Sequence, residues 1–182
     1  MTAKHGARLA CLLADQCSLV HDYVARQKIG GTHLKYHMKK QIVNLPPSHY
    51  NSADLAFIVP RVLELTHTAH DMQAWANDLL AAFPQADPRP PEQRHTPLPP
   101  FPWHPERRAQ LRAELDAHYA RLYGLTRDEL RYILDPADVL GPDYPSETFR
   151  VLKNNEMREF GEYRTQRLVL AAWDATENLT ML

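Results

Sequence analysis

Residues 105–123, PERRAQLRAELDAHYARLY, form the clearest helical pattern in the chain and decide its fold class. Apolar side chains recur three or four positions apart, which places them on one face of a helix, and charged residues take other positions. The apolar face consists of Leu111, Leu115, Tyr119 and Leu122. Gly124 ends the pattern, as glycine commonly does after a helix. We therefore expect an amphipathic helix here.

The segments that follow toward the C-terminus also predict helices. Thr126 and Glu129 have the spacing of a capping box, and Asp135-Pro136 closes the helix that this box opens. Ser146 is expected to cap the next helix, and Gly161 to kink it or divide it from the last one. The apolar residues of these later helices are Phe149, Leu152, Tyr163, Leu168, Leu170 and Trp173.

Toward the N-terminus, helical patterns cover residues 7–27 and 54–83, with a break expected near residues 66–68. Pro60 lies within the second pattern, so we expect its helix to begin near that proline. Residues 36–45 favour a small β element, ended by Pro46-Pro47. The sequence as a whole predicts a mainly α protein. The apolar residues of the first pattern, which stops at Gly30-Gly31, are Leu9, Leu12, Leu13, Cys17, Val20, Tyr23 and Val24.

Nine prolines fall within residues 84–105, a composition that favours extended polyproline backbone. We predict a linker or surface strap whose end packs on the domain through Phe101 and Trp103. The alternative is a partner-binding motif at Pro97-Leu98-Pro99-Pro100. The strap divides the chain into an N-terminal helical part, residues 1–83, and a C-terminal helical part, residues 106–182.

Overall charge and composition exclude few functions. The 182 residues carry a net charge of −1, so nucleic-acid binding requires a local basic patch. The sequence contains no apolar stretch long enough to span a bilayer, and residues 1–8 lack the apolar core of a signal peptide. Cys11 and Cys17 lie on different faces of one predicted helix, so no disulfide is expected between them. We expect a cytoplasmic protein with free, buried thiols.

Residues 26–40, RQKIGGTHLKYHMKK, form such a local patch and are called the basic segment below. No acidic residue occurs between Asp22 and Asp54. Lysine and arginine neutralise phosphates, glycine admits a phosphate close to the backbone amides, and Tyr or His side chains stack on bases or bind their edges. The alternative is a solvated basic loop without a partner. The predicted DNA-binding residues are Arg26, Lys28, Gly30, Gly31, Thr32, His33, Lys35, Tyr36, Lys39 and Lys40.

Two weaker patterns concern catalysis and metal binding. His67, His70 and Asp71 have a spacing that permits a metal site, but the predicted helix break separates the two histidines, and we expect no metal. Asp143 and Glu156 are similar to the carboxylates of a nuclease motif whose lysine is missing here. The sequence contains no nucleophile elbow, phosphate-binding loop or dinucleotide fingerprint. The chain therefore lacks a complete active site of its own.

Three groups of residues resemble the C-terminal region of large adenine-specific DNA methyltransferases, which are the fused type II restriction–modification enzymes and related phage-defence methylases. The resemblance covers nearly the whole chain except the proline-rich strap. The matching strings are DYVARQKIGGTHL (22–34) with KQI (40–42) and LPP (45–47), YGLTRDELRYILDP (123–136), and ETFRVLK (147–153) with EYRT (162–165).

In that family, an N-terminal part binds S-adenosylmethionine through a glycine-containing loop and holds the flipped adenine with an Asn-Pro-Pro-Tyr motif. This chain has neither, and Asn44-Leu45-Pro46-Pro47 departs from the second motif because Leu45 splits it. The resemblance therefore implies a DNA-engaging, target-recognition-associated segment without its own cofactor, as a piece of a larger protein or the product of an interrupted gene. The alternatives are a structural scaffold of the same parent that touches no DNA and, third, an independent nuclease or metal enzyme.

We predict that the chain alone neither binds S-adenosylmethionine nor transfers its methyl group, because both the cofactor loop and the adenine-pocket motif are missing. Calorimetric titration with S-adenosylmethionine tests this prediction. Binding in the micromolar range would contradict it.

Overall fold

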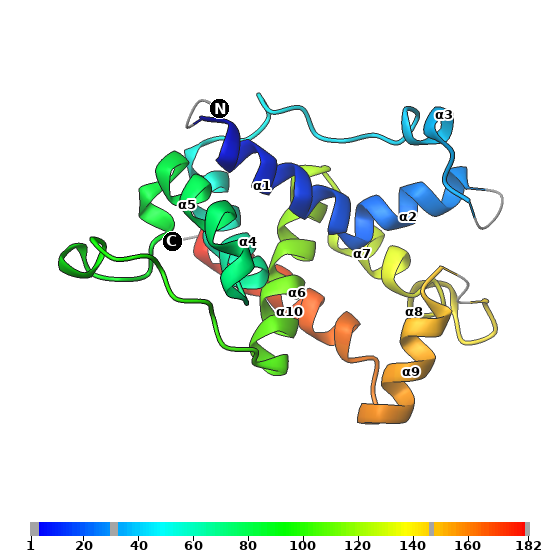
Figure 1. The fold of residues 1–182 in the computed structure, drawn as a ribbon. Coiled ribbons are helices and arrows are strands. Elements are labelled where there is room, and N and C mark those ends of the chain that lie inside the picture. The colour runs from blue at the N-terminus through cyan, green and yellow to red at the C-terminus, as the bar shows by residue number, and fades with distance from the viewer. Residues whose placement is uncertain (1–3, 30–32, 146–147, 181–182) are drawn as a thin grey trace. The chain divides into compact units, whose positions relative to one another are not determined.

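The computed structural model describes residues 4–29, 33–145 and 148–180, and the fold is mainly α, as predicted. No strand occurs in these ranges. Short 3₁₀ turns lie at His70–Met72, Pro84–Ala86 and Pro91–Gln93. The helices are α1 (Lys4–Cys17), α2 (Leu19–Lys28), α3 (Tyr36–Lys39), α4 (Ser52–Thr66), α5 (Gln73–Ala82), α6 (Pro105–Leu122), α7 (Arg127–Leu134), α8 (Ala137–Leu140), α9 (Arg150–Phe160) and α10 (Arg164–Thr180) (Figure 1).

The β element predicted near residues 36–45 is wrong. Tyr36–Lys39 forms the short helix α3, and the chain continues with turn hydrogen bonds from Gln41 N–H to the Met38 carbonyl and from Ile42 N–H to the Lys39 carbonyl. Leu45 N–H donates to the Asp15 carboxylate at 2.9 Å instead of to a neighbouring strand. A strand needs a partner for its backbone groups, and these groups are satisfied locally or by a side chain.

The chain forms two compact units that are not consecutive in sequence. Unit 1 consists of Met1–Gln16 and Asn44–Leu111, and unit 2 consists of Cys17–Val43 and Arg112–Leu182. The chain therefore passes from one unit to the other three times. The segment boundaries predicted from the sequence, at residues 83 and 105, both fall inside unit 1.

The single helix predicted over residues 7–27 is two helices, because Ser18 interrupts it. Ser18 has extended backbone and accepts a hydrogen bond from His21 N–H at 3.2 Å, which makes it the N-cap of α2. The predicted break after α4 is confirmed, since α4 ends at Thr66. Gly161 divides α9 from α10 with φ of 74°, a left-handed conformation that glycine adopts without strain.

In unit 1, α1 buries its small side chains and exposes its leucines, which reverses the predicted apolar face. Ala7, Ala10, Cys11 and Ala14 are buried. The reason is close packing, because a Cβ on Gly6 would lie only 2.9 Å from the carbonyl oxygen of Asp78 in α5. A side chain at Gly6 would therefore collide with the backbone of α5. The exposed fractions of the remaining apolar residues are 40% for Leu9, 38% for Leu12 and 40% for Leu13.

Helix α4 begins eight residues before Pro60, so the prediction of a start near that proline is wrong. Asn51 and Asp54 form a capping box, in which the Asp54 carboxylate accepts Asn51 N–H at 2.8 Å. The stabilisation that this capping box gives to the helix start outweighs the loss of the backbone hydrogen bond that Pro60 cannot donate. The Arg61 guanidinium donates to the Phe57 carbonyl at 2.8 Å, one turn earlier. The predicted apolar stripe is buried at Ile58, Val59, Val62 and Leu63.

The proline-rich strap packs onto unit 1 through hydrogen bonds to His67. The buried His67 ring lies with Nε2 at 2.9 Å from the Leu98 carbonyl, and Phe101 N–H donates to the His67 carbonyl at 2.8 Å. Leu98 is buried, whereas the Trp103 side chain remains 64% exposed beneath the Arg108 guanidinium. The prediction that the end of the strap packs on the domain thus holds for Phe101 and not for Trp103, and the burial of Leu98 was not predicted.

Unit 2 is built around the C-terminal part of α6. The alanines of α6 allow α2, α7 and α10 to approach closely. Two arginines add polar contacts to α10: Arg121 donates to the Trp173 carbonyl at 2.7 Å, and Arg127 pairs with Asp174 at 2.7 Å. The buried cluster consists of Val20, Ala113, Ala117, Ala120, Leu130, Leu134, Val169, Ala172 and Trp173.

Asp116 is a buried carboxylate on α6, although charged positions of this helix were predicted to face away from the core. It accepts Leu19 N–H at 2.8 Å and so satisfies a backbone donor in the first turn of α2. Burial raises the pKa of Asp116 to about 7, although the Leu19 hydrogen bond and the Arg112 charge lower it.

The Thr126–Glu129 capping box is confirmed. Thr126 Oγ1 accepts Glu129 N–H at 3.3 Å, and the Glu129 carboxylate accepts Thr126 N–H at 2.7 Å. The predicted cap at Ser146 lies outside the described residues. None of the helices described above is long and apolar enough to cross a lipid bilayer.

Replacing Thr126 with Ala should lower the free energy of unfolding by about 0.5–2 kcal/mol, because the first turn of α7 loses its hydroxyl acceptor. Urea denaturation measures the change. Thr126→Ser keeps the hydroxyl and should stay close to the wild type. Equal midpoints for the Ala variant and the wild type would mean that this cap does not stabilise the fold.

Replacing Asp116 with Asn should stabilise the protein increasingly as the pH rises from about 4 to 7. The pKa of Asp116 is higher in the folded state than its ordinary value of 3.8, so the favourable contribution of its protonated form is lost as the pH rises through this window. Asparagine keeps an acceptor for Leu19 N–H and never ionises.

Urea denaturation at several pH values measures the difference in unfolding free energy between Asp116→Asn and the wild type. This difference should grow by a few kcal/mol and level off above pH 7. Replacement of the exposed Asp143 by Asn controls for the loss of one negative charge. A constant difference in unfolding free energy between Asp116→Asn and the wild type from pH 4 to pH 8 would contradict the prediction.

Candidate nucleic-acid interface

The basic segment belongs to unit 2 and is held near both of its ends. On its N-terminal side, α2 buries Val20 and Ala25. On its C-terminal side, Ile42 is buried and the Tyr123 hydroxyl donates to the Val43 carbonyl at 3.4 Å. The part between these anchors contains the four-residue helix α3 and otherwise no regular element in its described residues. The segment is therefore an irregular excursion attached at both sides.

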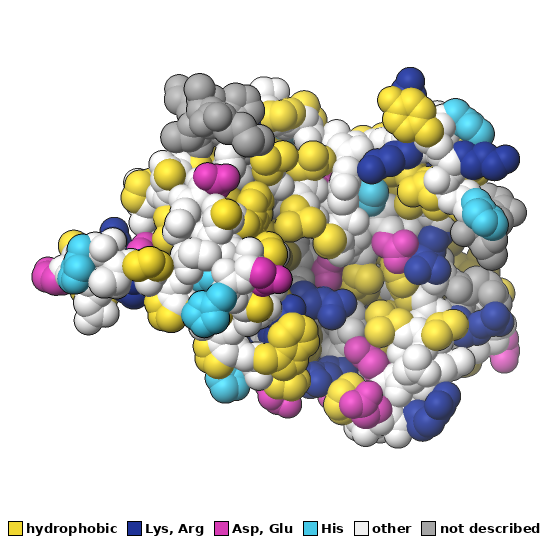
Figure 2. All heavy atoms as spheres, viewed as in Figure 1, with side chains coloured by type: hydrophobic (Ala, Val, Ile, Leu, Met, Phe, Trp, Pro, Cys, Tyr) yellow, Lys and Arg dark blue, Asp and Glu magenta, His cyan; other side chains and the backbone are white. Residues whose placement is uncertain are grey.

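All predicted DNA-binding residues in the described part of the segment are exposed. Figure 2 shows Lys, Arg and His side chains gathering where α3 and the neighbouring end of α2 lie. Gly30, Gly31 and Thr32 lie outside the described residues. The exposed members of the predicted set are Arg26, Lys28, His33, Lys35, Tyr36, Lys39 and Lys40.

Arg26 differs from the lysines because its charge is already paired. Its guanidinium makes two hydrogen bonds of 3.0 Å to the Asp22 carboxylate and lies 5.6 Å from the centre of the Phe149 ring. The spacing of Asp22 and Arg26, four residues apart on one helix, permits this pair. The contact with Phe149 joins segments far apart in sequence and was not predicted.

Three lysines of the basic segment carry unpaired charges. Within the described part of the chain, Lys28, Lys35 and Lys39 have no carboxylate within ion-pairing distance. Several other basic side chains of the described structure do contact acidic ones. These pairs are Arg89–Asp87, Arg107–Glu64, Arg127–Asp174, Arg131–Asp128, Arg131–Asp138, Lys153–Asp135 and Arg167–Glu162.

Tyr36 is an exposed aromatic residue among the lysines of the basic segment. Its side chain is 74% exposed, and Lys40 Nζ lies 4.5 Å from the centre of its ring. His37, the next residue on α3, is also exposed and was not included in the predicted set. Its position within the lysine-rich helix is the signal that identifies it. The described segment thus presents three unpaired lysines, a lysine–tyrosine pair and exposed histidines on one stretch of chain.

The residues considered for metal binding do not come together. His67 is buried and its ring contacts the Leu98 carbonyl, whereas His70 and Asp71 are exposed on the following turn. Over the described residues, no group of three or more His, Cys, Asp or Glu side chains could hold a metal ion.

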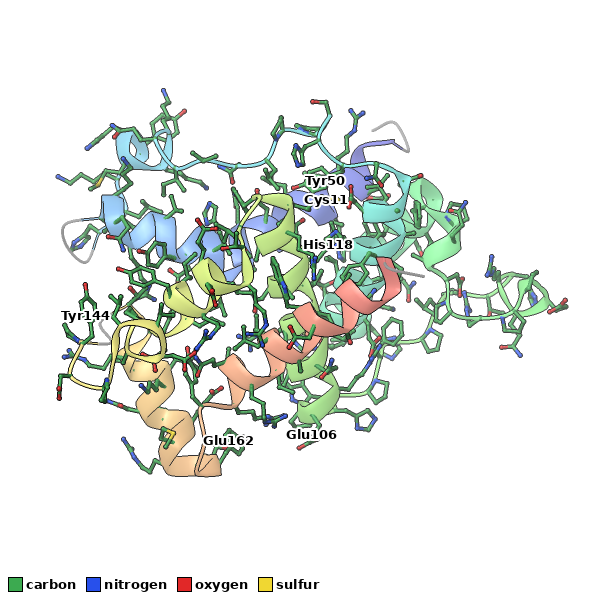
Figure 3. All side chains as sticks on the ribbon, turned by 180° about the vertical axis from the view of Figure 1, so that it is seen from behind. Cys11, Tyr50, Glu106, His118, Tyr144 and Glu162 are labelled. Carbon is green, nitrogen blue, oxygen red and sulfur yellow. The ribbon has the colours of Figure 1, made fainter. Side chains whose placement is uncertain are left out.

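The two carboxylates considered for nuclease chemistry, Asp143 and Glu156, have surroundings that do not suit a nuclease site. Glu156 accepts two hydrogen bonds from Thr165, at 2.8 Å from its N–H and 2.6 Å from its hydroxyl, and so joins α9 to α10. Asp143 lies in the exposed loop after α8. Three other titratable side chains of the same unit, Tyr144, Glu162 and His118, lie apart from one another and form no cluster (Figure 3).

The cysteines differ in environment. Cys11 is buried, and burial raises the pKa of its thiol to about 12, with further contributions from the Asp54 and Asp15 charges. This thiol is therefore protonated at neutral pH and is a poor nucleophile. Cys17 is exposed, which contradicts the expectation that both thiols are buried.

A recess of about 260 Å³ lies between the strap and α5 in unit 1. Two arginines line it, but their guanidinium groups are engaged by the strap itself. Arg89 bonds to Asp87 and to the Thr96 and Pro97 carbonyls, and Arg94 bonds to the Arg89 and Asp87 carbonyls. These contacts stabilise the fold of the strap. The basic segment therefore remains the stronger candidate site.

No protein-family model matches the chain, and no curated protein or solved structure matches it significantly.

Proposed function

We propose that this chain is a non-catalytic, DNA-engaging segment associated with target recognition in a larger DNA adenine methyltransferase of a restriction–modification or phage-defence system, acting in the cytoplasm. The observation that supports DNA engagement is the exposure of Lys28, Lys35 and Lys39 without carboxylate partners in the described structure. Three such cations on one acid-free stretch present a local positive charge, although the whole chain is nearly neutral.

The three lysines are available to external phosphate groups, because the nearby acidic side chains of the chain already have other partners. The carboxylates nearest in sequence, Asp22 and Asp54, are occupied by Arg26 and by the Asn51 capping box. The lysine ammonium groups therefore stay available to an external anion. A polyanion that contacts several of them at once gains from counterion release, which a single small anion does not provide.

The parent protein is inferred from the resemblance of the three residue groups. S-adenosylmethionine and the adenine pocket belong to that parent, and this chain supplies contacts to DNA. The coding sequence next to that of this chain tests the parentage. An in-frame upstream methylase with an Asn-Pro-Pro-Tyr motif would support it, and an unrelated neighbour would contradict it.

A second candidate function is a scaffold or interaction module of the same parent without DNA contact. The observation that favours it is the exposed stripe of Leu9, Leu12 and Leu13 on α1. Exposed apolar residues at neighbouring helical positions are typical of a face that contacts another protein surface. If the scaffold function is correct, Leu12→Glu should weaken binding of this segment to the rest of the parent protein. It should leave the DNA affinity of the free chain unchanged.

Replacing Lys28, Lys35 and Lys39 together with Ala should weaken DNA binding and reduce its salt dependence. Each phosphate contact contributes about 0.9 to the slope of log affinity against log salt on duplex DNA, so the slope should flatten by about 2.7. The loss should be similar for all DNA sequences, because lysine–phosphate contacts do not distinguish bases. Fluorescence anisotropy over a salt series, starting at low salt, measures both quantities.

The matched control replaces the same three lysines with Arg, which keeps the charge and should keep the slope. A second control replaces Arg8 and Arg158, two exposed arginines elsewhere, with Ala and should change binding little. Unchanged affinity and slope for the triple Ala variant would show that the basic segment is a solvated loop, and the scaffold function would then be the better explanation.

A further inference from the structure

We propose that Tyr36 and Lys40 form a stacking site for an unpaired nucleotide, so that the basic segment prefers single-stranded to duplex DNA. This inference rests on the proposed DNA-engaging function and specifies the form of DNA that is bound. It depends on the exposure of one aromatic ring and on the cations around it.

The Tyr36 ring is available to a ligand. Its exposed fraction of 74% is unusual for a large aromatic side chain, which gains from burial when a partner surface is present. Lys40 Nζ lies 4.5 Å from the ring centre, a distance typical of a cation–π contact. Because α3 ends at Lys39 and Lys40 caps it, the helix itself fixes the two side chains close together.

The cations next to Tyr36 are placed for the phosphates of a stacked nucleotide. Lys35 immediately precedes Tyr36 at the N-cap position of α3, without a side-chain capping hydrogen bond, and Lys39 lies one turn later. An aromatic ring combined with flanking lysines is the arrangement that single-stranded nucleic acids favour, because every base has a π face and every linkage has a charge. No base-specific hydrogen bond is required for such binding.

The described backbone of the basic segment is poorly suited to a duplex groove. The helix α3 contains four residues and is about 6 Å long, so it has little more than one turn of side chains to place in a major groove. The neighbouring helix α2 buries Val20 and Ala25 in unit 2. An aromatic ring can stack on a base of a duplex only after that base is unpaired or its step is unstacked, whereas a single strand offers its bases without this cost.

An anionic lipid surface is the main rival partner. Leu34 and Val43, with exposed fractions of 51% and 59%, place apolar side chains near the lysines. Membrane-surface binding, however, usually depends on an amphipathic helix that buries a continuous apolar face. The short α3 provides no such face, since Lys35, His37 and Lys39 alternate with the apolar residues. Nucleic acid is therefore the favoured partner.

The experiment compares binding of the full chain to a labelled oligothymidylate and to a duplex of equal length at low salt. The wild type should bind the oligothymidylate more tightly. Tyr36→Ala should weaken that binding about fivefold to a hundredfold, and Tyr36→Phe should keep it, because stacking needs the ring and not the hydroxyl. Tyr144→Ala, at another exposed tyrosine of unit 2, is the matched control and should bind like the wild type.

The outcomes separate this inference from the function on which it rests. The stacking site would be overturned if the chain binds the duplex at least as tightly as the oligothymidylate and Tyr36→Ala leaves that binding unchanged. If the duplex binding also depends on the three lysines, the proposed function would still stand. Failure to bind either form of DNA would overturn both. Lysine-dependent binding to phosphatidylserine vesicles without binding to DNA would also overturn both and would identify a lipid surface as the partner.

Discussion

Hydrogen bonds from backbone N–H groups to buried aspartates organise this structure. A buried carboxylate is costly unless it is well bonded, and a backbone donor at a helix start or turn lacks a partner within its own element. Each buried carboxylate in the described ranges meets such a donor, so one interaction satisfies both requirements. The pairs are Asp15 with Leu45, Asp54 with Asn51, Asp87 with Arg89, Asp116 with Leu19, and Asp135 with Ala137.

This use of aspartate has a consequence for the distribution of charge. Several acidic side chains are buried or paired with arginine or lysine, whereas lysines of the basic segment have no such partners in the described structure. Asp116 and Asp15 hold Leu19 and Leu45, which lie on either side of that segment. In a chain whose net charge is −1, the basic segment thus keeps a local positive charge.

Small side chains are the second organising feature, and they explain which apolar residues stay outside. Alanines on α1 and α6 and Gly6 bring helices of each unit close together. Close approach stabilises the helices through many short contacts, and it excludes leucine from the same face. Unit 1 exposes the leucines of α1, and unit 2 exposes the lysines of the basic segment. The leucines are suited to a protein partner and the lysines to a polyanion.

Features that depend on neighbouring residues followed from the sequence alone: the mainly α fold, the Thr126–Glu129 cap, the division at Gly161, the helix break after Thr66 and the acid-free basic segment. These depend on helical periodicity and on backbone preferences within a few positions. The tertiary structure decided which face of α1 is buried, why residues 36–45 form no strand, and that Asp116 lies inside. Each of these depends on contacts between segments distant in sequence. For the candidate site, the lysines were predictable by composition, whereas the exposure of Tyr36 followed only from what the fold leaves uncovered.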